Sequence, residues 1–167
     1  LLVVLAENGL GTSYLFNEIK VGSELTFRGA QGVFTLPENL DKDLFLICTG
    51  TGIAPFRSMV NYIKLHKISF RNIHLIFGCR RKEDLLYHEE LKKLEIELPG
   101  FHYHPTLSRE HWDGHFGYVH PIYMDLCKNR QEAQFFLCGW KHMIDEAKKH
   151  ITEMGYDKKS VHQELYG

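Results

Sequence analysis

Two glycine-containing segments carry the residues best suited to bind a phosphate and to present a thiol. The first is Thr49-Gly50-Thr51-Gly52, which follows the apolar run 44–48, and the second is Cys138-Gly139, which ends the apolar run 134–138. Glycines let a backbone approach a ligand closely, and the free N–H groups at a helix start favour an anion. We therefore expect the first segment to hold a diphosphate and the second to bring the Cys138 thiol to a reacting carbon.

Each segment also has an ordinary structural interpretation. Pro55 suits the first turn of a helix, where a missing N–H costs nothing, so a helix is expected to begin soon after Gly52. The same glycines suit a plain strand-to-helix turn, and their spacing is not GxGxxG, so the standard dinucleotide fingerprint does not apply. For Cys138 the alternative is a buried strand cysteine, which is the commonest state of that residue.

From Pro37 onward, apolar runs alternate with helix-like segments. We predict strands at 44–48, 72–77, 101–106, 134–138 and 161–165, and helices at 54–67, 84–97, 118–128 and 140–154. Strands that alternate with helices indicate a parallel sheet covered on both faces. The predicted fold class is therefore α/β, with a five-stranded parallel, doubly wound, Rossmann-like sheet. Ligands of such sheets bind beyond the carboxyl ends of the strands, where both glycine segments fall.

Residues 1–36 follow a different pattern, which predicts a strand, a short helix and a second strand. The segment 9–13 is expected to form a turn before a helix at 14–19, and the alternation over 24–28 indicates a half-exposed strand. The apolar run 1–6 has neither an initiator Met nor the basic flank of a signal peptide. We therefore expect the sequence to begin in the middle of a longer chain.

Composition narrows the classes of protein that fit. A chain of 167 residues suits one domain, or one domain plus a piece of another. With 20 Lys and Arg against 21 Asp and Glu, nothing indicates nucleic-acid binding, and no apolar run approaches the roughly 20 residues that span a bilayer. The four cysteines show no CxxC spacing, which favours reduced thiols in a cytoplasmic protein. The eleven histidines, among them His102-x-His104, lack partners at metal-ligand spacing, so we expect no metal.

Four blocks, in order along the chain, resemble the ferredoxin–NADP reductase family. They are 49–58, then 77–81 with 86–91, then Ser108-Arg109-Glu110, then Cys138-Gly139 with Met143. The segment 162–167 is similar to the terminal strand of that family, so the resemblance covers nearly all of residues 40–167. It implies an NAD(P)-binding domain at 39–167, preceded at 1–38 by the C-terminal part of an FAD-binding β-barrel domain.

The resemblance also implies which residues bind the nucleotide. Those at the diphosphate are Gly50, Thr51, Gly52, Ile53, Ala54 and Pro55; those at the adenosine are Arg80, Ser108, Arg109 and Tyr118; those at the nicotinamide end are Gly139, Trp140 and Met143. Cys138, Thr51 and Glu164 would surround the carbon that gives up hydride. Trp140 stands where the family usually has Pro. For Tyr118 the alternative is ordinary core packing, and for Arg80 it is a solvated pair with Arg81.

The residues after the third predicted strand bear on the choice of nucleotide. Arg109 offers a charged fork and Ser108 a hydroxyl, and both suit the oxygens of a ribose 2′-phosphate. A site that binds the free 2′,3′-diol more often has a carboxylate at this place. NADPH is therefore favoured over NADH, although Glu110 follows immediately.

The flavin half is represented by fewer residues. Leu10, Gly11, Thr12 and Ser13 resemble the turn that receives the flavin diphosphate, the stretch 29–34 resembles the segment that closes the barrel, and Tyr166 resembles the terminal aromatic that covers the flavin. The Arg-x-Tyr-Ser/Thr element that holds the flavin in this family does not occur in the sequence. We therefore do not expect these 167 residues by themselves to hold FAD tightly.

The function implied by the resemblance is that of an FAD-dependent NAD(P)H reductase. Hydride would pass from NADPH, or NADH, to FAD, and electrons would then pass to a ferredoxin, a flavodoxin, a haem domain or an oxygenase component. The sequence has no C-x4-C-x2-C pattern, so no iron–sulfur centre is expected in it. Two alternatives are a nucleotide-binding module without redox turnover of its own and a reductase of small molecules such as free flavin.

Overall fold

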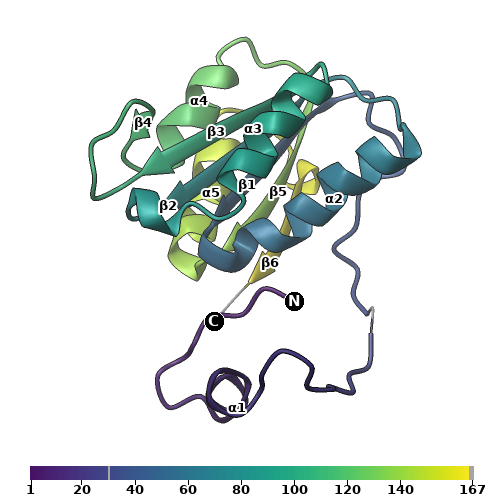
Figure 1. The fold of residues 1–167 in the computed structure, drawn as a ribbon. Helices are drawn as coiled ribbons and strands as arrows, with labels where there is room; N and C mark the ends of the chain where they lie inside the picture. The colour runs from purple at the N-terminus through teal and green to yellow at the C-terminus, as the bar shows by residue number, and fades with distance from the viewer. Residues whose placement is uncertain (30, 166–167) are drawn as a thin grey trace.

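A six-stranded sheet forms the centre of the computed structural model, which describes residues 1–29 and 31–165 (Figure 1). The strands are β1 (Asp43–Thr49), β2 (Ile73–Cys79), β3 (Phe101–Leu107), β4 (His115–Phe116), β5 (Ala133–Gly139) and β6 (Val161–Leu165). Their order is β4-β3-β2-β1-β5-β6, and every neighbouring pair is parallel. All strands therefore end at one edge of the sheet.

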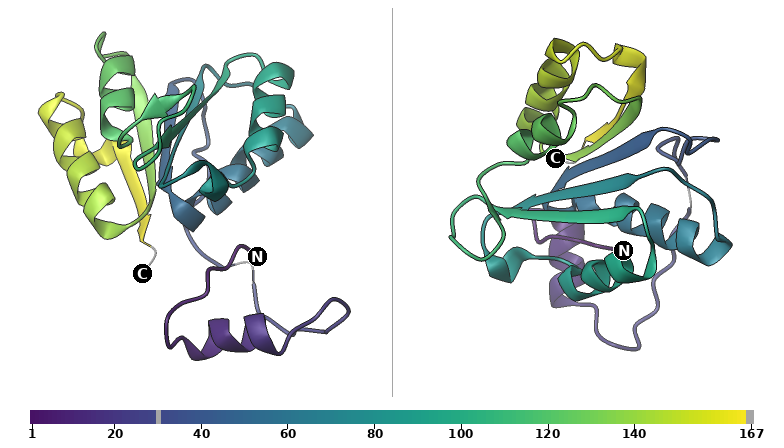
Figure 2. Two further views of the ribbon diagram at one scale, coloured as in Figure 1. Left: turned by 60° about the vertical axis from the view of Figure 1, so that its left-hand side comes forward. Right: turned by 90° about the horizontal axis from the view of Figure 1, so that it is seen from above.

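Helices cover both faces of this sheet. They are α2 (Ile53–His66), α3 (His88–Glu97), α4 (His120–Leu126) and α5 (Lys141–Glu153), whereas α1 (Leu10–Asn17) lies in the N-terminal segment, away from the sheet (Figure 1). Short 3-10 turns are η1 (Gly50–Gly52), η2 (Lys82–Asp84) and η3 (Lys158–Ser160). Figure 2 shows α2 and α3 on one face and α4 and α5 on the other. On β1, Leu44 and Leu46 pack toward α2, whereas Phe45 and Ile47 pack toward α5, which is the alternation a strand dictates.

The predicted α/β class and the five long strands are confirmed, with boundaries that differ by one or two residues. The predicted helix at 84–97 is wrong in its first part, because the chain forms η2 and then begins α3 only at His88. Tyr87, immediately before α3, has φ 58°, a left-handed conformation that interrupts a helix. The two-residue strand β4 was not predicted, since a pair this short carries no periodicity.

The strands predicted within residues 1–36 are wrong for the part of the segment that the structure describes. Residues 1–29 and 31–42 contain α1 and no strand. An apolar run becomes a strand only when another strand satisfies its backbone groups, and this segment meets none. The turn predicted at 9–13 is also wrong, because the bond from the Ser13 N–H to the Gly9 carbonyl (2.9 Å) starts α1 at Leu10.

The N-terminal segment lies beyond the end of β6, on the side where the strands end (Figures 1 and 2). Phe34, near the end of this segment, packs against the core. The centroid of its ring lies 5.9 Å from that of Phe56 on α2 and 5.4 Å from that of Phe136 on β5. The large side chains of α1 and of the loop that follows it are mostly exposed, including Leu10, Phe16 and Phe27.

Candidate nucleotide-binding site

The turn between β1 and α2 has the geometry expected of a phosphate loop. Thr49 ends β1, Gly50–Gly52 form η1, and α2 begins at Ile53 with Pro55 in its first turn. No side chain among the described residues caps the start of α2. The positive end of the α2 dipole therefore faces the edge where the strands end, which favours an anion there.

Two glycines let this turn lie directly against the end of β5. A Cβ on Gly52 would lie 2.3 Å from the carbonyl oxygen of Cys138, and a Cβ on Gly139 would lie 2.4 Å from Thr49 Oγ1. Gly139 also has φ 142°, a conformation that other residues rarely adopt. The backbone of the predicted diphosphate segment and that of the predicted hydride segment therefore meet, as their positions at strand ends led us to expect.

Cys138 is held between two neighbouring strands by the register of the sheet. Its Cα is paired with that of Cys48 on β1 and with that of Glu164 on β6. Residues in register on parallel strands project to the same face, so Glu164 lies beside Cys138 on the α2 side. The Cys138 side chain is fully buried, Glu164 is exposed, and Thr51 is half-buried in η1. Burial, with the neighbouring Cys138 and Cys79, raises the pKa of the Cys48 thiol well above its usual value, so Cys48 stays protonated.

A basic groove lies beside this turn, at the carboxyl ends of β2 and β3. It has a volume of about 690 Å³, and its lining residues are Arg81, Lys82, Glu83, Arg109 and Glu110. The Lys82 N–H donates to Glu110 Oε2 at 2.9 Å, which joins the loop after β2 to the loop after β3. Lys82 and Glu83 were not predicted as site residues, because solvated charges on a short loop give no periodic signal.

Some polar groups in and beside this groove already form hydrogen bonds or ion pairs within the protein, and others do not. Ser108 Oγ donates to the carbonyl oxygen of Cys79 at 3.2 Å, and Arg81 pairs with Glu83 at 3.7 Å. The exposed guanidinium groups of Arg80 and Arg109 form no ion pair within the described part of the chain. Glu110 Oε2 accepts from the Lys82 N–H, so one oxygen of this carboxylate is engaged within the groove.

Three further predicted residues lie around the two halves of the site. Tyr118 is 75% exposed, which excludes the core-packing alternative and leaves its ring open to a ligand. Trp140, just before α5, is 67% exposed, and its backbone N–H donates to Thr49 Oγ1 at 3.3 Å. Met143 lies in the first turn of α5 and is buried against the sheet, so its side chain is not exposed at the site.

The predicted flavin residues are only partly present in the site. Leu10, Gly11, Thr12 and Ser13 form the first turn of α1, and no side chain of a described residue caps that helix. The Thr12 hydroxyl donates to the Gly9 carbonyl (3.3 Å) and accepts from the Ala6 N–H (3.1 Å), so it is already bonded locally. Tyr166 lies outside the described residues. The role of this segment at a flavin therefore remains a prediction from the resemblance.

Neither a metal centre nor a membrane span is found in the described structure. Within residues 1–29 and 31–165, no three His, Cys, Asp or Glu side chains are arranged so that they could hold a metal ion. The helices of this described part are also too short or too polar to cross a bilayer.

Comparison with known proteins identifies the family. Residues 46–149 match the oxidoreductase NAD-binding domain family. The chain is 31% identical to ferredoxin–NADP reductase B of Sorangium cellulosum (99% of this chain, 71% of the relative) and 31% identical to NADH-cytochrome b5 reductase 1 of Candida albicans (95% and 55%). A solved ferredoxin–NADP⁺ reductase from Neisseria gonorrhoeae, with bound FAD and NADP, has the same fold, with a TM-score of 0.74 at 23% identity over 96% of this chain and 71% of that one.

The chain therefore belongs to the ferredoxin–NADP reductase-like oxidoreductases, through their NAD-binding domain. The expected family, that of NAD(P)H-dependent reductases that use FAD, is confirmed. The chain spans 55% of the length of the cytochrome b5 reductase relative, so the activity of a complete protein does not follow from these matches alone.

Proposed function

We propose that this chain binds NADPH for a flavin-dependent reductase, with residues 39–167 as the nucleotide domain and 1–38 as part of the flavin domain. The observation that carries this proposal is the contact between the β1–α2 turn and the end of β5, which brings an anion-binding helix start next to Cys138. The basic groove supports a second phosphate contact at the same sheet edge. A dinucleotide that carries a diphosphate and a separate 2′-phosphate, as NADPH does, matches this pair of sites.

The residues of the chain would act mainly by positioning. The start of α2 would hold the diphosphate, Arg109 and Ser108 the 2′-phosphate, and Tyr118 the adenine. Gly139 would leave room for the nicotinamide beside Cys138, with Glu164 and Thr51 around it. Holding the donor carbon about 3–3.5 Å from its acceptor is the main contribution a protein makes to such a transfer. Bound FAD would accept the hydride and release electrons to a carrier, for which a ferredoxin, a flavodoxin, a haem protein or an oxygenase component are candidates.

Titration of the full chain with NADPH and NADH tests the assignment. We expect Arg109→Ala to weaken NADPH binding about ten- to hundredfold, because a charge-assisted contact contributes about 1.5–3 kcal/mol, and to change NADH binding less than threefold. Lys149→Ala, which removes an equal charge from the exposed face of α5, should leave both dissociation constants unchanged. Equal losses for the two nucleotides would refute the 2′-phosphate role, and a lack of affinity for both would refute the proposed function.

A nucleotide-binding module without redox turnover is the second candidate. It is favoured by the complete burial of the Cys138 side chain, which keeps the thiol from direct contact with a bound ring in this structure. Protein that is yellow and bleaches with NADPH supports the reductase. Colourless full-length protein that binds NADPH and reduces no acceptor supports the module, and turnover with free flavin alone supports a small-molecule reductase.

A further inference from the structure

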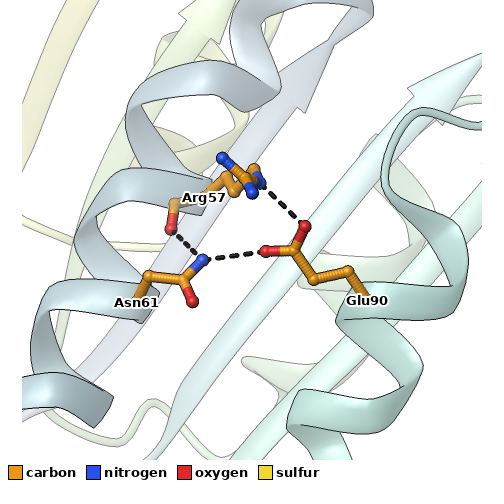
Figure 3. A network of polar contacts seen from close by, with 3 residues as sticks. All are labelled: Arg57, Asn61 and Glu90. Carbon is orange, nitrogen blue, oxygen red and sulfur yellow. Dashed lines mark hydrogen bonds and ion pairs between the residues drawn. The ribbon is translucent and has the colours of Figure 1, made fainter.

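A polar cluster joins α2 to α3 at the end of both helices that lies nearest the nucleotide site. Arg57 Nε donates to Glu90 Oε2 at 2.9 Å, and Asn61 Nδ2 donates to Glu90 Oε1 at 2.9 Å (Figure 3). Asn61 Nδ2 also donates to the Arg57 carbonyl oxygen at 3.0 Å. The guanidinium carbon of Arg57 lies 4.4 Å from the centre of the Tyr87 ring.

The cluster connects the two parts of the site that the proposed nucleotide must span. Arg57 lies in the second turn of α2, the helix that begins directly after the phosphate loop. Tyr87 ends the loop that starts at Arg80 and contributes Arg81 and Lys82 to the basic groove. Arg57 contacts both Tyr87 and Glu90. These contacts therefore link α2, at whose start the diphosphate would bind, to the loop that would bind the adenosine part of the nucleotide.

The contacts of Glu90 with Arg57 and Asn61 constrain the orientation of α2 relative to α3 more than they contribute to the stability of the fold. Side chains one turn apart on α2 bind the two oxygens of a single carboxylate, which fixes the rotation of α2 about its axis relative to α3. The Arg57 and Glu90 side chains are 41% and 33% exposed, and ion pairs exposed to this degree contribute little to folding. The two helices are already held on the sheet by buried side chains such as Phe56, Val60 and Leu91.

We propose that Arg57, Asn61 and Glu90 are positioning residues for dinucleotide binding. They hold the start of α2 and the basic groove at the separation that one NADPH molecule spans. This inference rests on the proposed function. A ligand that occupies only the groove does not need the two parts held in register, whereas NADPH must contact both of them at once.

The chain supplies a matched control on the same pair of helices. Lys64 of α2 and Glu97 of α3 form a second ion pair at 2.5 Å, near the other end of both helices and away from the strand ends. Removing Glu97 deletes a comparable contact between α2 and α3 without touching the end that faces the site. Any effect that comes only from weaker helix packing should therefore appear in both variants.

The test compares two ligands across these variants of the full chain. Dissociation constants of NADPH and of 2′-AMP, which carries the adenosine and its 2′-phosphate but no part of the diphosphate, are measured by calorimetric titration. We expect Glu90→Ala to weaken NADPH about tenfold and 2′-AMP less than twofold, the order expected when a coupling contact is lost. Glu97→Ala should leave both ligands within twofold of wild type. Glu90→Gln, which keeps one acceptor oxygen, should recover part of the loss and provides a milder variant if Glu90→Ala does not fold.

Several outcomes separate this inference from the proposed function. Equal losses of NADPH and 2′-AMP in Glu90→Ala, or equal effects of Glu90→Ala and Glu97→Ala on NADPH, would overturn the positioning role. An unchanged NADPH affinity in both Glu90 variants would do the same. Wild-type protein that binds neither ligand would instead overturn the proposed function.

Discussion

At the scale of single residues, the register of the sheet fixes the neighbours of Cys138, which we propose lies beside the nicotinamide. The register places it between Cys48 and Glu164, and Gly52 brings the phosphate loop against its carbonyl group. A thiol is small and polarizable, so it can contact a nicotinamide ring without blocking transfer from the opposite face. Its side chain has no exposed surface in this structure, so contact with a ring requires the neighbouring groups to move aside.

We expect Cys138→Ala to slow hydride transfer at least about tenfold while the NADPH dissociation constant changes less than about twofold, since the substitution alters ring placement and leaves the phosphate contacts in place. Rapid-mixing absorbance of flavin-loaded full-length protein measures the rate, and equilibrium titration measures the affinity. Cys127→Ala is the control, because Cys127 is buried in the α4–α5 cluster on the opposite face of the sheet. An unchanged transfer rate in Cys138→Ala would make this residue an ordinary core cysteine.

At the scale of elements, the β1–η1–α2 unit is the proposed phosphate site. The strand is buried, the turn is formed by glycines, and the helix start is left without a side-chain cap among the described residues. These three features follow from local sequence. The approach of the turn to β5 does not, because it requires β5 to be the strand next to β1. An anion site of this kind therefore depends on two elements that are distant in sequence.

We expect Gly52→Ala to lower the free energy of unfolding by about 1–3 kcal/mol, because its Cβ would lie 2.3 Å from a backbone oxygen of β5 that cannot move easily. Chemical denaturation monitored by circular dichroism measures this change. Gly11→Ala in α1 is the control, since a Cβ there meets nothing within 4 Å and alanine favours a helix. The expectation fails if the two variants have equal stability.

At the scale of the whole molecule, the sheet has a histidine-rich region on the α4–α5 side, across β2, β3 and β4. The ring of His74 stacks on those of His102 and His104, with centroids 4.9 and 5.4 Å apart, and His104 lies 6.1 Å from His115. His74 Nδ1 and His104 Nε2 are 3.2 Å apart, at hydrogen-bond distance, with the tautomers deciding which nitrogen donates. Burial, with the neighbouring histidines, lowers the pKa of His74 and that of His104 to about 4, while Asp43 partly opposes the shift of His74.

These pKa values predict a loss of stability in acid. The unfolded chain takes up protons near pH 6.5, and the folded chain takes them up at these two sites only near pH 4. The unfolded state therefore binds more protons between these values, so the contribution of the pair to the free energy of unfolding is constant above about pH 7 and falls as the pH decreases from 6.5 toward 4. We expect a loss of about 2 kcal/mol for the pair at pH 5, after discounting for partial exposure.

Urea denaturation at several pH values measures this slope. The double variant His74→Gln with His104→Gln removes both titrating groups, so its stability should depend less steeply on pH in this window. A wild-type stability that is constant from pH 7 to pH 5, or a variant with the same slope as wild type, would contradict the assignment to these two histidines.

Most of the nucleotide domain could be predicted from the sequence, because its elements follow local periodicity. The five long strands and the helices α2, α4 and α5 were expected at nearly their observed bounds. The prediction failed where tertiary context decides the conformation. Tyr87 adopts a left-handed backbone that no local pattern indicates, and the apolar residues 1–6 form no strand because they have no partner strand.

The sequence by itself determined the α/β class, the position of the glycine turn between β1 and α2 and the residue types at each strand end, since these depend on side-chain alternation and on glycine between a strand and a helix. Only the tertiary structure decided which of these residues meet. The placement of Glu164 beside Cys138, the groove shared by Arg81 and Arg109, and the link from Arg57 to Glu90 all depend on strand order and helix packing. Those arrangements follow from burial of surfaces that are far apart along the chain, and local sequence patterns do not carry that information.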